Sequence, residues 1–255
     1  MLQPFNYHTH TFRCRHAEGE DREYVEAAIK AGYKILGFSD HCPWVYEDGF
    51  VSTMRMAPGD VEGYFHSLET LRDEYKNEIQ IFIGFESEYV PELMEGQDRL
   101  LSDFPLDYMI LGQHFLGQEH KSVYLGAPLR NDEILHRYVD TVIEGVKTGK
   151  YLYVAHPDVI HFIGSEKYYE TEMTRLCTFL MEADMPIEIN QLGAADGRQY
   201  PSDRFFQIAK KIGNTCIVGI DAHAPHQLLN KRGSAITEEF IQKHSLPLLQ
   251  APPLS

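Results

Sequence analysis

The chain has 255 residues, of which 43% are hydrophobic, and its formal net charge is −15 at pH 7. This length allows a sizeable core in one barrel or in two small domains, and we expect a single domain over residues 1–255 with a loose, proline-rich tail from about residue 246. The acidic balance, without a run of lysines or arginines, argues against a general nucleic-acid-binding surface. An anionic substrate would therefore need local positive charge.

Export and membrane signals are not evident in the sequence. The amino-terminal stretch lacks a basic segment followed by an apolar one, and no apolar run approaches the ~18 residues that cross a membrane. The four cysteines, Cys14, Cys42, Cys177 and Cys216, show no Cys-x-x-Cys spacing. We expect a soluble cytoplasmic protein with reduced thiols and no membrane partner.

The first informative stretch is Tyr7-His8-Thr9-His10, which follows an apolar start and opens into a polar loop. Side chains two apart in a strand share a face, so His8 and His10 would point the same way, about 7 Å apart. Such a pair suits two imidazoles that converge on one cation. An isolated pair of histidines near an amino terminus is more often a tag remnant or a surface feature, so the interpretation depends on the rest of the chain.

Helical and strand patterns alternate along the remaining sequence. Apolar residues at helical spacing predict helices at 21–30, 61–75, 92–101, 134–146, 166–182, 205–212 and 235–243. Short apolar runs predict strands at 33–38, 79–85, 106–112, 151–155, 186–190 and 216–220, in addition to the one that ends at the two histidines. Positions 41–57 lack periodicity, which indicates a lid or binding loop, with a disordered insertion as the alternative.

Polar side chains that can bind metals stand at the carboxyl end of every predicted strand. They are His8 and His10, Asp40 and His41, Glu86, His114, His156, Asn190, and Asp221 and His223. In an open sheet these groups would lie too far apart to meet, whereas a barrel brings all strand ends around one mouth. No glycine-rich phosphate loop supports a nucleotide-binding open sheet. We therefore predict an α/β fold, a barrel of seven β/α units.

Histidines and carboxylates that converge in one partly buried mouth require cations, since they would otherwise repel one another or take up protons. Any one of these histidines alone is more often a core or surface residue, but their shared place at strand ends favours a metal site. Mixed imidazole and carboxylate ligands suit Zn, Mn, Fe or Co better than Ca, and they do not discriminate among these four metals.

Eight ordered motifs resemble those of the polymerase and histidinol phosphatase (PHP) superfamily. They are His8-Thr9-His10, Cys14-x-His16, Ser39-Asp40-His41, Gly84-Phe85-Glu86, Gln113-His114, Ala155-His156-Pro157, Glu188-Ile189-Asn190 and Asp221-Ala222-His223. More narrowly, His16-Ala17, Phe38-Ser39-Asp40-His41-x-Pro43 and the later Arg55-Met56 resemble its histidinol-phosphatase branch. The match covers about residues 5 to 225 and implies a distorted (β/α)7 TIM-like barrel, with the active site at the carboxyl-terminal ends of the strands.

Carried over residue by residue, the resemblance implies three metal positions. The first would be bound by His8, His10, Glu86 and Asp221, the second by Glu86, His114 and His156, and the third by His16, His41 and His223. Two to three divalent transition-metal ions (Zn, Mn, Fe or Co) would then be the cofactors. Cys14 and Cys42 neighbour proposed ligands and thiolates bind zinc well, but we expect both thiols to serve packing.

The branch resemblance implies a histidinol-phosphatase, which hydrolyses L-histidinol phosphate to L-histidinol and phosphate in histidine biosynthesis. A metal-bridging hydroxide would attack phosphorus at the metals held by Glu86 and Asp221, and Asp40 or a metal-bound water would protonate the leaving alkoxide. The alternatives are a PHP-type phosphoesterase acting on other monoesters or on nucleotides, as an exonuclease does, and a metal-storing or regulatory module without catalysis.

Arginines in strand-end loops are candidates for holding the substrate phosphate, because a guanidinium can pair with phosphate bidentately. Arg198, in the loop after the further candidate Asn190, is the first choice. The alternatives are Arg13, Arg15 and Arg55. Arg198 would serve no such role if it only pairs with Asp196 or with solvent.

Overall fold

The computed structural model describes residues 2–254, which divide into two compact units. The first unit comprises residues 2–87, 91–109 and 219–231, and the second comprises residues 88–90, 110–218 and 232–254. The expectation of a single domain stays a prediction. Among the described residues, no helix is both long and apolar enough to cross a membrane.

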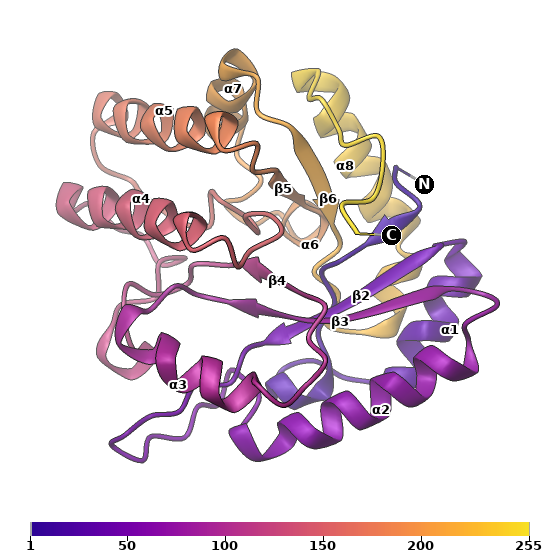
Figure 1. Cartoon of the computed structure of the whole chain (residues 1–255). Coiled ribbons are helices and arrows are strands. Elements are labelled where there is room, and N and C mark those ends of the chain that lie inside the picture. Colours follow the sequence, from indigo (N-terminus) through magenta and orange to yellow (C-terminus); the bar gives the residue numbers. More distant parts are fainter. Residues whose placement is uncertain (1, 255) are drawn as a thin grey trace. The chain divides into compact units, whose positions relative to one another are not determined.

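The first unit is built on a parallel sheet. Its strands are β1 (Phe5–Asn6), β2 (Ile35–His41) and β3 (Gln80–Ser87), with β4 (Tyr108–Leu111) next in the sheet. Its helices are α1 (Asp21–Ala31), α2 (Val61–Glu74) and α3 (Pro91–Leu101), with the short 3-10 helices η1 (Phe12–Cys14), η2 (Pro58–Asp60) and η4 (Pro225–Leu229). Helix α2 packs against β3 and beside α1 (Figure 1). Strands β2 and β3 are buried along nearly their whole length, as expected for a parallel sheet whose faces are both covered.

The register of this sheet places polar strand ends side by side. Strand β2 pairs with β3 from Ile35 opposite Gln80 through to His41 opposite Glu86. Residues 39–41 follow the predicted strand 33–38, yet they belong to β2. The side chains of Ser39 and Asp40 are buried although they are polar. Beyond β1 the chain stays extended, and Thr9 forms a parallel bridge with Ala222.

The second unit contains the remaining elements. They are β5 (Ile187–Asn190), β6 (Cys216–Gly219), α4 (Asp132–Lys147), α5 (Glu166–Glu182), α6 (Gln191–Asp196), α7 (Asp203–Ile212), α8 (Lys231–His244) and η3 (Glu119–Lys121). Helix α5 packs between α4 and α7 (Figure 1). Ser202 caps α7, since its hydroxyl accepts from the backbone N–H of Phe205.

Two predictions about the second unit need correction. The predicted strand 151–155 is reduced to the bridge residue Val154, which pairs with Leu111 on one side and Ile187 on the other. Proline 157 and the positive φ of His156 (29°) end the extended segment there. The tail from residue 246 is not loose at its start, because the Cys216 N–H donates to the Pro247 carbonyl (2.7 Å) and the Leu249 N–H donates to Cys216 (2.9 Å).

Tyr108 links the backbone after β1 to strand β2 in the first unit. Its buried hydroxyl donates to the carbonyl oxygens of Tyr7 (2.7 Å) and Phe38 (3.0 Å). The close approach requires glycine on the facing strand, since a Cβ at Gly84 would lie 2.6 Å from the Tyr108 carbonyl oxygen. The backbone of β4 can therefore reach β3 only where a side chain is missing.

Replacing Gly84 with alanine should destabilise the protein, because backbone atoms cannot move aside as a flexible side chain can. We expect Gly84→Ala to lower the free energy of unfolding by about 1–3 kcal/mol. The matched control is Gly63→Ala in α2, where a Cβ would meet nothing within 4 Å and alanine should raise stability by roughly 0.5–1 kcal/mol. Urea unfolding measures both changes, and a shift of the same sign for the two variants would contradict the packing argument.

Candidate metal centre

Two backbone ladders orient His8 and His10 in the first unit. The His10 N–H donates to the Ala222 carbonyl (2.8 Å), and the Ala222 N–H donates to the His8 carbonyl (3.2 Å). On the other side, the Ser39 N–H donates to the Thr9 carbonyl (2.8 Å). The extended backbone turns the two imidazoles to one face, with ring centroids 5.2 Å apart, as the His-x-His spacing predicted.

An inner cluster forms where these histidines meet two carboxylates. His8 Nε2 lies 3.5 Å from Glu86 Oε2 and 3.4 Å from Asp221 Oδ1. His10 Nε2 lies 3.5 Å from the same Glu86 oxygen and 3.1 Å from the same Asp221 oxygen. All four side chains are buried. The structure thus brings together the four residues predicted for the first metal position.

An outer cluster contains the three histidines predicted for the third position. Nitrogens of His16, His41 and His223 all lie within 4.8 Å of one another, and His16 Nε2 is 3.1 Å from His223 Nε2. His41 Nδ1 also lies 3.1 Å from Glu86 Oε2, so the Glu86 carboxylate contacts both clusters. Imidazole nitrogens and a carboxylate oxygen at these spacings fit a divalent transition metal.

Opposed charges shift the pKa values of the inner cluster. Burial would lower the pKa of His10, but its contacts with Asp221 and Asp40 hold that pKa well above the usual value. Burial would raise the pKa of Asp221, but the neighbouring imidazoles of His8 and His10 keep it well below its usual range. At neutral pH and without a metal, His10 therefore carries a proton between two carboxylates. A metal cation would replace that positive charge.

The outer histidines behave differently. Burial and the neighbouring charge of His10 lower the pKa of His223 to about 3, and the same causes lower the pKa of His16. Both imidazoles are therefore neutral at pH 7, with a ring nitrogen able to bind a cation. His16 and His223 can therefore bind a metal at pH 7 without first losing a proton.

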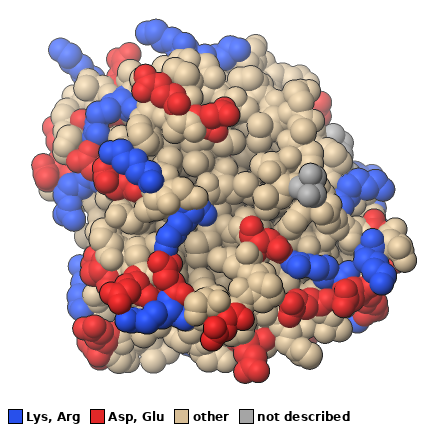
Figure 2. All heavy atoms as spheres, in the orientation of Figure 1, with Lys and Arg blue, Asp and Glu red and all other residues tan. Residues whose placement is uncertain are grey.

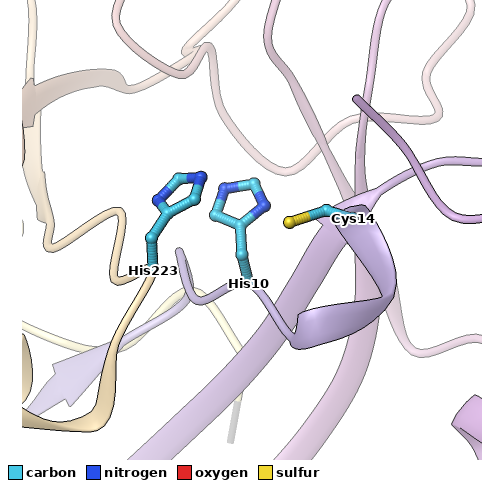
Figure 3. A group of neighbouring side chains, drawn as sticks. All are labelled: His10, Cys14 and His223. Atoms are coloured by element: carbon cyan, nitrogen blue, oxygen red, sulfur yellow. The ribbon is translucent and has the colours of Figure 1, made fainter. Parts of the chain in front are cut away.

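Cys14 lies beside the two clusters. Its Sγ and ring nitrogens of His10 and His223 all lie within 4.8 Å of one another, and Figure 3 shows the thiol next to His10. Burial and the charge of Asp40 raise the pKa of the Cys14 thiol, which disfavours the thiolate that binds metals. Cys42 is also buried and accepts a hydrogen bond from Gln97 Nε2 (3.0 Å). A packing role for both cysteines stays the prediction.

Two further candidate ligands belong to the second unit. The His114 and His156 rings are 4.9 Å apart, and His114 Nδ1 lies 3.3 Å from Glu88 Oε1. The backbone N–H of His156 donates to Glu188 Oε2 (2.9 Å). The predicted second metal position combines these two histidines with Glu86 of the first unit and stays a prediction.

Comparison with known proteins identifies the family. A profile described as "PHP domain" matches residues 6–192. The chain belongs to the PHP domain family. A Deinococcus radiodurans protein named "Probable histidinol-phosphatase" is 24% identical over 247 residues, which cover 91% of this chain and 90% of that protein. A Bacillus subtilis protein named "Histidinol-phosphatase" is 30% identical over 121 residues, or 45% of each chain.

A solved PHP structure shows the fold class. It is the crystal structure of histidinol phosphate phosphatase from Lactococcus lactis, in complex with zinc, L-histidinol and phosphate. The two structures superpose with a TM-score of 0.72 at 19% identity, over 96% of this chain and 95% of the other. The predicted α/β fold of the distorted, TIM-like PHP type is therefore confirmed.

The predicted phosphate-binding arginines of this PHP chain mostly have protein partners. Arg13 Nη1 donates to Asp21 (2.8 Å), and Arg55 is buried with Nη1 donating to the Cys42 carbonyl (3.0 Å). Arg15 is exposed and ends η1 in a left-handed conformation (φ 70°). The contact with Asp21 favours a structural role for Arg13. Phosphate binding by Arg15 or Arg55 stays a prediction.

The predicted loop after Asn190 begins with the short helix α6 (Gln191–Asp196), and Arg198 lies in the loop that follows this helix. The Asn190 side chain caps α6 by accepting from the Gly193 N–H (2.8 Å), and Gly197 ends the helix at φ 67°. Arg198 Nη1 donates to the Tyr200 hydroxyl (2.9 Å), while Nη2 lies 3.4 Å from Asp196. A role of either residue toward substrate stays a prediction, and the Asp196 pairing weighed as the alternative is present.

Sequence reasoning did not assign roles to three polar residues. Glu88 contacts His114, Glu188 holds the backbone at His156, and Thr11 donates its hydroxyl proton to Asp40. Spacing offered a signal for the first, because Glu88 stands two residues after Glu86 at the end of the same strand. The other two depend on contacts between distant segments, which no local pattern records.

The Asp40 carboxylate lies beside the His10 ring and positions it. One oxygen accepts from the His41 N–H (2.9 Å) and lies 3.6 Å from His10 Nδ1, and the other accepts from Thr11. A carboxylate behind a ligating imidazole fixes the ring orientation, which aims His10 Nε2 at the inner cluster. Because both oxygens have protein partners in a fully buried setting, positioning is favoured over the proposed proton donation.

Asp40→Asn should weaken metal binding. We expect the zinc affinity to fall roughly 10–100-fold, as is typical when the partner behind a ligand is lost. Competition with a chromophoric chelator measures the change. Asp73→Asn on the exposed surface of α2 is the matched control and should bind zinc as the wild type does. Equal affinities in all three proteins would contradict the positioning role.

Proposed function

We propose that this PHP-family protein is a histidinol-phosphatase, a metal-dependent phosphoric monoester hydrolase that converts L-histidinol phosphate to L-histidinol and phosphate in histidine biosynthesis. The observation that carries the proposal is the pair of neighbouring clusters in the first unit, the inner one buried, whose imidazole and carboxylate groups suit divalent transition metals. Relatives that align with about nine-tenths of the chain carry the histidinol-phosphatase name, which supports this substrate.

The proposed cofactors are two to three divalent ions among Zn, Mn, Fe and Co. His8, His10, Glu86 and Asp221 would hold one, and His16, His41 and His223 another. His114 and His156 are the proposed ligands of a further ion. When bound, such ions lower the pKa of a coordinated water towards neutrality and stabilise the charge on a transferring phosphoryl group.

The residues of the chain would prepare this chemistry in three ways. The Glu86 carboxylate lies between the inner and outer histidines, so it can hold two cations close together. Asp40 and Thr11 fix the His10 ring. Burial of the inner cluster excludes water and strengthens every electrostatic interaction within it. The clustered cations would also supply the local positive charge that an acidic chain needs to attract a phosphate.

A nucleic-acid substrate fits the face shown in Figure 2 less well. On the face shown in Figure 2, acidic and basic side chains intermingle instead of gathering into a continuous basic track. Proteins that follow a nucleic-acid backbone present clustered lysines and arginines. We therefore expect a small phosphate monoester as the substrate.

Turnover of a substrate panel with metal analysis tests the proposal. Protein purified without chelator should contain two to three transition-metal equivalents and hydrolyse histidinol phosphate with a higher kcat/KM than nucleotides or phosphodiesters. Chelation should abolish the activity, and added Zn or Mn should restore it. Active protein with less than one equivalent would overturn the metal assignment. Preference for nucleotides would favour the exonuclease-like alternative, and binding without turnover would favour a storage module.

Acidification should release the metals, because a proton and a cation compete for the same imidazole nitrogens. We expect metal content and activity to fall below about pH 6. Because the pKa of His10 is raised, zinc binding at pH 7 should also release a proton from this imidazole. Calorimetric titration in two buffers of different ionisation enthalpy measures this release. Identical heats in the two buffers, or unchanged activity at pH 5, would contradict the cluster assignment.

A further inference from the structure

The segment 42–57, between β2 and η2, folds around a cavity of about 190 Å³. The metal clusters do not account for it, although it contains the Arg55-Met56 pair that resembles the histidinol-phosphatase branch. Both residues line the cavity and are buried. The segment is therefore an ordered loop with buried side chains around a cavity, and the alternative of a disordered insertion is wrong.

The cavity wall is mainly aromatic and apolar. Trp44 and Met56 are only 3% and 1% exposed, and the rings of Tyr46 and Phe50 meet edge to face at 5.3 Å. Arg55 is the one charged residue of this wall. An engineered apolar cavity of about 150 Å³ is known to bind benzene, so this space has the size and lining for a single small ring. A planar ring can stack on the aromatic wall.

Hydrogen bonds anchor the cavity directly to the metal clusters. The Met56 N–H donates to the His41 carbonyl (3.4 Å), and the Cys42 N–H donates to the Glu86 carbonyl (2.8 Å). Trp44 is three residues beyond His41, so their Cα atoms are at most about 11 Å apart. Met56, which lines the cavity, is therefore a direct backbone neighbour of the candidate ligand His41.

We propose that this cavity binds the planar heteroaromatic ring of the leaving alcohol and thereby selects phosphate monoesters that carry such a ring. The assignment rests on the proposed phosphatase function and goes beyond it by locating substrate selection in segment 42–57. Arg55 is the charged residue of this wall, and its Nη1 donates to the Cys42 carbonyl (3.0 Å). The positive charge of Arg55 favours a neutral ring over a protonated one.

Intrinsic fluorescence tests occupancy directly, because Trp44 is the only tryptophan of the chain. Titration of the metal-loaded protein with L-histidinol should change the Trp44 emission in a saturable way. Alaninol, which has the same amino alcohol end without the ring, is the matched control and should leave the emission unchanged. The reverse result, a response to alaninol alone, would overturn ring binding.

Two methionines of the same segment provide a matched pair for kinetics. Met56 lines the cavity, whereas Met54 is 42% exposed and is not part of the wall. Met56→Ala should lower kcat/KM for histidinol phosphate roughly tenfold to a hundredfold, mainly through KM, and should affect the ringless glycerol 3-phosphate far less. Met56→Leu should restore most of the loss. Met54→Ala should behave as the wild type.

The outcomes separate the cavity proposal from the phosphatase function. Equal losses on both esters in Met56→Ala would show a structural effect and overturn the cavity proposal. Turnover of histidinol phosphate without a Trp44 response or a Met56 effect would overturn it and leave the phosphatase function standing. A saturable Trp44 response to L-histidinol without turnover of its phosphate would support the cavity and overturn the function.

Discussion

The parallel pairing of β2 with β3 is the constraint on which the candidate site depends, because it sets His41 opposite Glu86. A slip of one residue would turn every side chain of the strand to the other face and remove Glu86 from both clusters. The tight contact of Tyr108 with Gly84 holds this register from the next strand. The same backbone ladder therefore sets both the packing at the middle of the sheet and the geometry of the candidate ligands at its end.

That geometry is electrostatically unfavourable for the chain alone. Burying ionised carboxylates costs free energy unless opposite charge lies near, and the raised pKa of His10 shows that the chain recruits a proton to supply it. A divalent cation supplies more charge at the same place. Because a metal binds the folded site and not the unfolded chain, its binding energy adds to folding stability. Without a metal, the buried cluster therefore lowers the stability of the fold, and packing elsewhere, as at Tyr108, has to offset this cost.

The sequence predicted most of this arrangement, since helical periodicity and apolar runs are local and polar residues at strand ends mark a barrel mouth. His8 and His10 share a face as their spacing required. One failure is local, because the α6 segment contains Gly193 and was predicted as a loop, whereas the Asn190 side chain caps it as a helix. The other failures involve contacts between distant segments, since the role of Asp40 depends on Thr11, 29 residues away.

The two parts of the proposed active site also differ in how far they could be foreseen. The metal clusters use side chains at the ends of regular strands, where a fold common to many proteins places ligands, and such a site serves any phosphate ester. Segment 42–57 has no periodicity, so its cavity follows from tertiary packing of side chains such as Trp44 and Met56. Backbone hydrogen bonds join the segment to His41 and Glu86, two of the candidate ligands. With the role proposed for this segment, exchange of its side chains would change the selected substrate, while the backbone that presents the ligands stays as it is.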